Sequence, residues 1–414
     1  MAVLLALTLI VVAGLPAAVL LDRRECPSPA RLLGSSFLLG SGLVWLILLA
    51  MSIAGVPWSR LAVTAVMLLV TIALWLAAWK AGRAANPPAW GATWIDLVTL
   101  GVLAVHGFIA ARKAVGSGDF WAIWGLKGRV FFEHGGIDWA YLRDPFNAFQ
   151  HSDYPLLLPL NHAFVALHDG VWSDRWMGLL TTFYAAALVL IVRDLFGREL
   201  PRRIAALATL GVAAIATSPW IGTAEGPMVA YGAAGLLLLR SGPTPLGAIL
   251  LGLAACAKNE GLALVAAAGV ALLLSRRGRE VWPLWPAVVV ASPWLILRGL
   301  HGLEGYFRAG ALDLARVVPI FQGIARQPSA RPLLWVALVI ALVAFARSLP
   351  RERFVLLACL MLLLAYLAAY LATSFDVLWQ VAYSWPRLIE HVSVPLAFVA
   401  LMISGRELRM KIRK

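Results

Sequence analysis

The feature that most constrains this chain is a succession of long apolar runs separated by clusters of charged residues. Backbone that crosses a membrane must satisfy its own hydrogen bonds, and a helix of about 20 apolar residues does so across the bilayer core. The shorter runs require short or locally thinned crossings. The sequence therefore predicts an all-α polytopic membrane protein, a bundle of about 13 transmembrane helices. The thirteen runs are 1–21, 33–54, 61–79, 94–111, 173–192, 204–220, 226–239, 244–257, 260–275, 282–297, 332–346, 354–373 and 392–404.

Composition agrees with this class. Of the 414 residues, 61% are hydrophobic and 14% are charged, whereas soluble proteins average about 45–50% and about 25%. These values exclude disordered, collagen-like, disulfide-rich secreted and nucleic-acid-binding chains. We attribute the net charge of +14 to basic loops that face the cytoplasm and anionic lipids. The three cysteines, Cys26, Cys256 and Cys359, form no C-x-x-C or Cys/His cluster, so neither a disulfide framework nor a zinc site is predicted.

The distribution of Lys and Arg predicts an orientation, because loops rich in these residues stay in the cytoplasm. With the N-terminus outside and the C-terminus in the cytoplasm, seven short inner segments hold 21 of the 35 Lys and Arg residues. This topology requires the short apolar segment 155–168, which contains Pro159, Asn161 and His162, to be a juxtamembrane or re-entrant helix on the outer face. The alternative is that one weak later run does not cross. The inner segments are 22–32, 80–93, 193–203, 240–243, 276–281, 347–353 and the basic tail 405–414.

The same topology divides the chain into N-terminal helices in 1–93, a transmembrane core in 94–404 that contains the outer loops 112–172 and 298–331, and the tail. Almost all remaining ionisable residues fall on the outer face, where polar groups are costly unless paired or hydrated. We therefore expect one polar cavity that faces outside. His106, deep in a helix, is interpreted as a hydrogen-bonded core residue, with a functional role as the alternative. The outer ionisable residues are Asp119, Lys127, Arg129, His151, Asp153, Glu225, Lys258, Glu260, Arg298, Arg387 and His391.

Three outer motifs carry these residues, and each allows a structural and a functional interpretation. Asp119 follows Gly-Ser-Gly and opens an interfacial helix, so it is either the N-cap of that helix or a catalytic carboxylate. In His-Ser-Asp-Tyr-Pro, at 151–155, the polar side chains either cap the next helix or form a polar cluster. Lys258 and Glu260, in a tight Lys-Asn-Glu-Gly turn, form either a surface ion pair or part of a site.

A family resemblance is carried by four segments: D-F-W-A-I-W-G-L-K-G-R at 119–129, H-S-D-Y-P-L-L-L-P-L at 151–160, K-N-E-G at 258–261 and R-L-I-E-H-V-S-V-P-L at 387–396. With these segments the chain resembles glycosyltransferases of the GT-C class, such as the protein O-mannosyltransferases and the aminoarabinose transferase of lipid A. It looks like a prokaryotic branch of that class. The resemblance implies a GT-C-like bundle in the prokaryotic plasma (inner) membrane, with an active site that faces outside.

In that class the acid of the first outer loop, here Asp119, acts as the catalytic base. The resemblance runs from about Asp96 to the C-terminus. This chain departs from the class pattern because Asp119 is followed by Phe120 rather than by a second acid, and because three apolar runs precede the family-like core.

The resemblance further implies a polyprenyl-phosphate-linked sugar as donor, held among membrane lipids, and a glycan, lipid or protein as acceptor. Transfer needs a base for the acceptor hydroxyl and cations for the leaving phosphate. We expect Asp119 to be the base, and Asp153 and Glu225 to orient the substrates. No G-x-G-x-x-G or P-loop for a nucleotide donor is present, no cofactor is required, and a divalent metal between the three carboxylates stays an alternative. The expected phosphate or substrate ligands are Lys258, Arg387, His151, Lys127, Arg129, Glu260 and His391.

Two other functions stay open at this level. One is a non-catalytic role, as a lipid-linked-sugar translocase or a membrane scaffold subunit. The other is an enzyme like the O-antigen ligases and polymerases, which use a diphosphate donor and rely on arginines in a large outer loop. Loop 298–331 supplies Arg308, Arg316, Arg326 and Arg331 for such a role.

Overall fold

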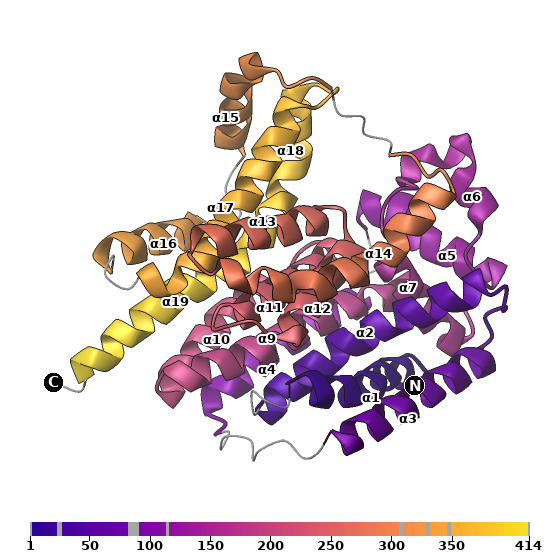
Figure 1. Cartoon of the computed structure of the whole chain (residues 1–414), viewed down its shortest axis with the longest axis horizontal. Helices are drawn as coiled ribbons and strands as arrows, with labels where there is room; N and C mark the ends of the chain where they lie inside the picture. The colour runs from indigo at the N-terminus through magenta and orange to yellow at the C-terminus, as the bar shows by residue number, and fades with distance from the viewer. Residues whose placement is uncertain are drawn as a thin grey trace.

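The structure, a computed structural model, describes residues 2–22, 27–81, 91–112, 116–305, 310–327, 332–345 and 349–412. This part of the chain is built from helices and contains no strand (Figure 1). Each apolar run predicted from the sequence coincides with a helix within these residues. The all-α class is therefore confirmed. Cys26 lies outside the described residues, whereas Cys256 and Cys359 are buried free thiols.

Eight helical segments in the described part of the chain are long and apolar enough to cross a membrane. The other five predicted runs form helices of only 13 or 15 residues, so crossing by all thirteen stays a prediction. The long segments contain α1 (Ala2–Asp22), α2 (Pro29–Ile53), α3 (Arg60–Lys80), α4 (Trp94–Arg112), α9 (Leu179–Glu199), α14 (Trp285–Leu300), α17 (Leu349–Leu371) and α19 (Glu390–Ile412). The shorter helices are α10 (Arg202–Ala216), α11 (Glu225–Leu239), α12 (Pro245–Ala257), α13 (Glu260–Leu274) and α16 (Pro332–Ala344).

Further short helices fill the predicted loops. In the first outer loop and just after it lie the π-helix η2 (Phe120–Trp124), α5 (Gly125–His134), α6 (Trp139–Arg143), the 3-10 helix η3 (Pro145–Gln150), α7 (Leu157–Asp169) and α8 (Asp174–Met177). Before and after α14 lie η4 (Gly278–Glu280), η5 (Trp282–Leu284), η6 (Leu314–Arg316) and α15 (Val317–Arg326). The helix α18 (Val377–Leu388) leads into α19.

Helix α7 is the segment that the predicted topology requires not to cross. It has 13 residues, about 20 Å of helix, and is therefore shorter than the bilayer core of about 30 Å. Twelve of its side chains are buried, and it packs on α1, α2 and α5. The helix is therefore enclosed by the protein rather than lying along its surface, and its neighbours can satisfy its ends.

The N-terminal helices pack directly on the rest of the bundle. Helices α1 and α2 approach so closely that a Cβ on Gly14 would lie 1.9 Å from the carbonyl oxygen of Ser36. A Cβ on Gly40 would lie 1.8 Å from the carbonyl oxygen of Ile10. Small residues permit such close contact between helices in membranes. Helix α2 also packs on α9, and α1 on α7 and α12, so these helices share the core of the remaining bundle.

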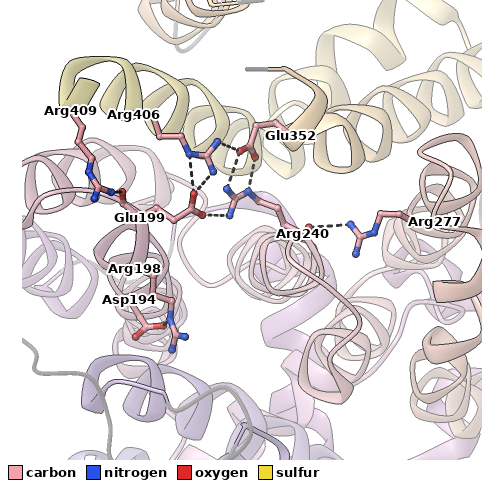
Figure 2. A network of polar contacts seen from close by, with 8 residues as sticks. All are labelled: Asp194, Arg198, Glu199, Arg240, Arg277, Glu352, Arg406 and Arg409. Atoms are coloured by element: carbon pink, nitrogen blue, oxygen red, sulfur yellow. Dashed lines mark hydrogen bonds and ion pairs between the residues drawn. The ribbon is translucent and has the colours of Figure 1, made fainter. Parts of the chain in front are cut away.

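A closed ring of ion pairs ties four helices together at one end of the bundle (Figure 2). Arg240, just after α11, pairs with Glu199 at 2.7 Å and with Glu352 at 2.6 Å. Arg406 of α19 pairs with the same two carboxylates. Because Glu352 is fully buried and Arg240 nearly so, each partner is costly to remove. Helix α19 continues through most of the predicted tail 405–414 and carries Arg406 into the ring.

The predicted loops sort into two sets at opposite ends of the bundle. At the end that holds the ring, Arg31 at the start of α2 pairs with Asp22 and with Asp194, near the ends of α1 and α9. At the other end the two long outer loops meet, because Trp139 of α6 stacks on His301 with ring centroids 3.8 Å apart. The helices thus connect a basic, ion-paired end to an end formed by the predicted outer loops.

Candidate functional site

A cavity of about 420 Å³ lies at the end of the bundle opposite the ion-pair ring. Helix α11 begins at Glu225, beside the cavity, and ends next to Arg240 of the ring. Helix α17 likewise carries Glu352 in the ring and Tyr370 in the cavity wall. At 1.5 Å per residue these separations are about 22–27 Å. The wall itself combines four distant parts of the chain, namely η2, the turn at 151–154, the turn between α12 and α13, and the pair α17 and α18.

Asp119 precedes the π-helix η2 and contacts α18. The Tyr383 hydroxyl donates to one of its carboxylate oxygens, and Arg387 forms an ion pair with the other. The Asp119 side chain makes no capping hydrogen bond to η2, so the N-cap interpretation is wrong. Its side chain is 13% exposed and lines the cavity, where a ligand can reach it. Single π-turns of this kind occur often at functional sites.

Two cations and two further carboxylates form a buried charge network beside Asp119. Lys258 Nζ lies 2.9 Å from Glu225 and 3.0 Å from Glu260, and Arg387 also lies 3.6 Å from Glu225. Burial would lower the pKa of the Lys258 ammonium, but Glu225 and Glu260 outweigh burial and raise that pKa above its usual value. The Lys258–Glu260 ion pair that the turn suggested does form, as part of a buried network rather than at the surface.

Asp153 enters the cavity wall from the turn before α7. Asn259 Nδ2 donates to its Oδ2 at 2.9 Å, and Arg298 lies 3.8 Å from the same oxygen. The N-cap position of α7 is Leu156, so the capping interpretation of the 151–155 motif is wrong. Among the described residues Oδ1 of Asp153 has no hydrogen-bond partner. This motif therefore supplies a polar cluster to the cavity.

His151 lines the cavity in a left-handed backbone conformation, with φ 55° and ψ 68°. Its ring stacks on Tyr154 with centroids 4.5 Å apart, and Lys127 Nζ donates to its carbonyl oxygen at 2.7 Å. Lys127 is completely buried, and burial lowers its pKa to about 7 although Asp153 acts in the opposite direction. Lys127 therefore supports the strained turn at His151. Lys127 does not line the cavity, and its role as a phosphate ligand stays a prediction.

Three other expected site residues do not line the cavity. Arg129 pairs with Glu133 at 2.8 Å on the surface of α5, where its side chain is 55% exposed, so its role as a phosphate ligand stays a prediction. His391 Nδ1 lies 2.7 Å from the Tyr366 hydroxyl, in the layer behind the wall. Glu225 is also behind the wall, where it pairs with Lys258 and Arg387.

Three tyrosines of the aromatic cavity wall, Tyr366, Tyr370 and Tyr383, were not predicted from the sequence. Trp379 stacks on Tyr383, with ring centroids 5.5 Å apart and planes at 4°. Tyr366 and Tyr370 add two hydroxyl groups from α17. Trp379 and Tyr383, like Tyr366 and Tyr370, are four positions apart on one helix, so both members of each pair lie on the same face. This spacing is the sequence signal that could have identified them. Asn259 was not predicted either, because asparagine is common in a turn between two helices and its presence there does not indicate a binding site.

The divalent metal that the sequence left open does not fit these carboxylates. Asp119, Asp153 and Glu225 are each held by a different nitrogen donor from another part of the chain. Within the described ranges, no group of three or more His, Cys, Asp or Glu side chains is arranged to hold a metal ion. The cavity instead sets carboxylates against cations, an arrangement suited to proton transfer and phosphate binding.

His106 lies away from this cavity and is fully engaged. Its Nδ1 lies 2.8 Å from the Thr182 hydroxyl, and its Nε2 donates to the Ser218 carbonyl at 3.0 Å. These bonds tie α4 to α9 and to the chain after α10. The interpretation of His106 as a hydrogen-bonded structural residue is confirmed, although its side chain is half-buried rather than in the core.

Of the four arginines considered for a diphosphate donor, the two that the structure describes do not line the cavity. Arg316 pairs with Asp313 at 3.3 Å and donates to the Thr373 carbonyl. Arg326 is exposed at the end of α15. Arg308 and Arg331 lie outside the described residues.

Comparison with family models, with curated proteins and with solved structures finds no match for this chain. The function is therefore argued from the geometry and the charges of the cavity.

Proposed function

We propose that the protein is a membrane glycosyltransferase that moves a sugar from a polyprenyl-phosphate donor to an acceptor hydroxyl in this cavity. The observation that carries the proposal is the pairing of Asp119 with Arg387 in the cavity wall, beside Lys258. A carboxylate next to two cations brings together a proton acceptor and a phosphate-binding group. The stacked rings of Trp379 and Tyr383 add a flat apolar surface that suits one face of a sugar.

In the proposed reaction the acceptor oxygen bonds to the anomeric carbon while the bond between that carbon and the phosphate oxygen breaks. Asp119 takes the proton of the acceptor hydroxyl, and the phosphate leaves with the bonding electron pair as polyprenyl phosphate. Arg387 and Lys258 bind the phosphate oxygens, the first as a planar fork of donors and the second as a point charge. Glu225 positions both cations, and Asp153 orients the sugar.

The proposed site opens to the outer face of a prokaryotic inner membrane, with the N-terminus outside, the C-terminus inside and thirteen crossings. The separation of the predicted inner and outer loops to opposite ends of the bundle supports this arrangement. In this position the lipid tail of the donor stays in the bilayer while its phosphate and sugar enter the cavity.

The experiment uses the purified full-length chain in lipid nanodiscs with a panel of polyprenyl-phosphate sugars and with glycan, lipid and protein acceptors, and it measures release of polyprenyl phosphate. We expect release by the wild type and a turnover about 10²–10⁴-fold lower for Asp119→Asn. Folding is retained, since Asp119 caps no helix and Glu225 still neutralises Arg387.

Glu133→Gln, an exposed carboxylate of the same outer segment, is the matched control and keeps wild-type turnover. Two results contradict the proposal. One is a wild type that releases no polyprenyl phosphate from any donor. The other is Asp119→Asn turnover above about a tenth of the wild-type value, because a lost base costs at least about 10²-fold.

A further inference from the structure

Helix α15 carries an apolar face that no part of the described chain covers. The helix packs on α18, where a Cβ on Gly323 would lie 3.0 Å from Cγ1 of Val381. Figure 1 shows the two helices side by side at the edge of the molecule. Away from this contact, Val318 is 63% exposed and Phe321 is 56% exposed. Neighbouring exposed apolar side chains of this kind mark a surface that meets a protein or a membrane.

The side chains of α15 form three sectors around its axis. At about 100° per residue, the buried Ile320 and Gly323 are about 60° apart and define the face against α18. A second sector, about 100° wide, holds only exposed apolar side chains. These are the side chains of Val317, Val318, Phe321 and Ala325. The exposed polar side chains of Gln322 and Arg326 form the third sector. A helix with separate apolar and polar faces outside the protein contact suits a membrane–water interface.

The depth of α15 follows from its attachment to α17, one of the segments long and apolar enough to cross a membrane. Just before α15, the backbone N–H of Asp313 donates to the carbonyl oxygen of Leu371, the last residue of α17, at 3.1 Å. The N–H of Gly310 donates to the Ala372 carbonyl at 2.6 Å. Leu371 lies about 28 Å along α17 from Glu352 of the ion-pair ring, and a bilayer core is about 30 Å thick. The chain therefore enters α15 where α17 leaves the bilayer core.

A bilayer fits the apolar sector of α15 better than a protein does. The exposed Leu312 and Leu314 precede the helix and are the nearest exposed apolar residues before it in the sequence. A stable protein interface takes about 20–30 residues on each side, far more than this surface offers. An interfacial helix needs only a short apolar face, because it enters the bilayer to a depth of about 5–10 Å.

We propose that α15 is a membrane-surface anchor, whose apolar sector enters the boundary between headgroups and acyl chains in the leaflet on the cavity side. Helix α18 carries Trp379, Tyr383 and Arg387 of the cavity wall, so an anchored α15 holds this wall at the membrane surface. The inference is independent of the proposed transferase, since it supposes only that α17 crosses the membrane.

The experiment attaches a nitroxide spin label to single cysteines of the full-length chain in lipid nanodiscs. Power saturation measures how often the label collides with oxygen, which concentrates among acyl chains, and with a water-soluble nickel chelate. Phe321→Cys and Val318→Cys report on the apolar sector, and Gln322→Cys, in the polar sector, is the matched control. Leu364→Cys, exposed on α17, is the lipid reference, and Glu133→Cys, exposed on α5, is the water reference.

Cys26 is changed to serine in every variant, whereas Cys256 and Cys359 are buried and need no replacement. The ratio of oxygen to nickel collisions at positions 321 and 318 is expected to match that at 364. It should exceed the ratio at 322 by at least about tenfold, because a polar chelate is strongly excluded from acyl chains.

The unfolding midpoint shows whether each variant has folded, and Val318→Cys decides the question if Phe321→Cys does not fold. A ratio at 321 and 318 equal to that at 322 would place the apolar sector in water and overturn the anchor. Exclusion of both reagents from 321 and 318 would show that a second copy or another protein covers the sector, which would overturn it as well.

Discussion

Arg387 and Lys258 differ in what surrounds them, and this difference decides which substitution tests phosphate binding. Lys258 is buried between Glu225 and Glu260, so its removal leaves two buried carboxylates without a cation. Such a loss costs about 3–5 kcal/mol of folding free energy and would obscure an effect on binding. Arg387 is 12% exposed at the cavity. When it is removed, Asp119 keeps its hydrogen bond from Tyr383, and Glu225 keeps its ion pair with Lys258. A substitution at Arg387 therefore tests phosphate binding with a smaller effect on folding.

We predict that Arg387→Gln weakens binding of the polyprenyl-phosphate donor by about 10–100-fold, the value of one charged hydrogen bond to phosphate. Arg387→Lys keeps part of the affinity, because lysine supplies charge without the planar fork. Donor binding is measured by titration in nanodiscs, with the exposed Lys80→Ala as control. Unchanged affinity in Arg387→Gln would remove this residue from the phosphate site.

At this scale the sequence predicts the charged groups of the cavity but not their pairing. Charged residues are few in so apolar a chain, so Asp119, Lys258 and Arg387 stand out and are placed on one face by the topology. Their partners are set by tertiary packing, since Asp119 and Arg387 lie 268 positions apart in the chain. Tyr383 does not stand out, because tyrosines at membrane interfaces are common without any site.

The second prediction at this scale concerns pH. Burial lowers the pKa of the His151 imidazole from 6.5 to about 4, although Asp153 acts in the opposite direction. As the pH falls below 6.5 the unfolded chain binds this proton before the folded protein does. Stability is therefore full above that pH and is lost as the pH falls toward 4, by about 3 kcal/mol for this group.

The unfolding midpoint in detergent, followed from about pH 7.5 to about pH 4.5, should fall less in His151→Gln than in the wild type. His134→Gln, with a side chain 54% exposed, should behave as the wild type does. A residual decrease is expected in all three proteins, because burial also lowers the pKa of His162 to about 3. An identical decrease in His151→Gln and the wild type would contradict the assignment.

Among the elements, the α12–α13 hairpin determines where Lys258 and Glu260 stand. A Cβ on Gly261 would lie 2.3 Å from backbone atoms of Ala254 and Ala255, so the first turn of α13 touches the last turn of α12. Only glycine permits this approach, and any side chain must separate the two helices.

We predict that Gly261→Ala lowers the free energy of unfolding by about 1–3 kcal/mol, the usual cost of overpacking, and also weakens donor binding by shifting Lys258. Gly269→Ala, on the same helix, is the control, since its nearest neighbouring atom would be 4.0 Å away, at Leu284. Thermal unfolding and donor titration of both variants measure the two effects. Equal behaviour of the two variants would show that the hairpin tolerates a side chain at position 261.

The ion-pair ring is a second element-scale feature, and its role is structural. Arg240→Ala leaves the fully buried Glu352 with Arg406 alone, which should cost about 3–5 kcal/mol. Because the ring lies about 22 Å from the cavity along α11, donor affinity of the folded fraction should not change. Arg279→Ala removes an exposed arginine at the same end and should have little effect on the unfolding midpoint. A loss of donor affinity in folded Arg240→Ala would contradict a purely structural ring.

The sequence predicts the position of a helix where its apolar residues are continuous. It does not do so where the apolar residues lie along one face of the helix only. The long runs from 33–54 to 354–373 each predict a helix, because continuous hydrophobicity has one structural solution in a membrane. The segment 374–391 reads as a loop, yet it contains α18. Its buried residues, Val377, Val381 and Leu388, lie on one face only, so no continuous run marks this helix. The sequence therefore predicts Arg387 as a site residue but not the helix α18 that carries it.

At the scale of the whole molecule, the thickness of the bundle constrains how it sits in a membrane. Helix α11 covers 15 residues, about 22 Å, between the cavity and the ring, whereas a bilayer core is about 30 Å thick. If α11 crosses the membrane as predicted, it requires a locally thinned bilayer, or polar ends that reach into the bilayer core. A cavity sunk into one face meets this requirement, because it brings water and headgroups toward the middle of the bundle.

The last prediction concerns the side of the membrane to which the cavity opens. If the cavity opens outward, a single cysteine at Glu133 of α5 is labelled in intact cells by a membrane-impermeant reagent, and a single cysteine at Arg203 is labelled only after lysis. Both positions are exposed, whereas the neighbouring Leu200 is buried and would resist the reagent on either side. Cys256 and Cys359 are buried and need no replacement, and Cys26 is changed to serine in both variants. The assignment follows from the Arg-rich segments at the end of the ring, which favour the cytoplasm. Labelling of position 203 in intact cells would reverse the bundle, and the proposed donor and acceptor would then have to be sought on the cytoplasmic side.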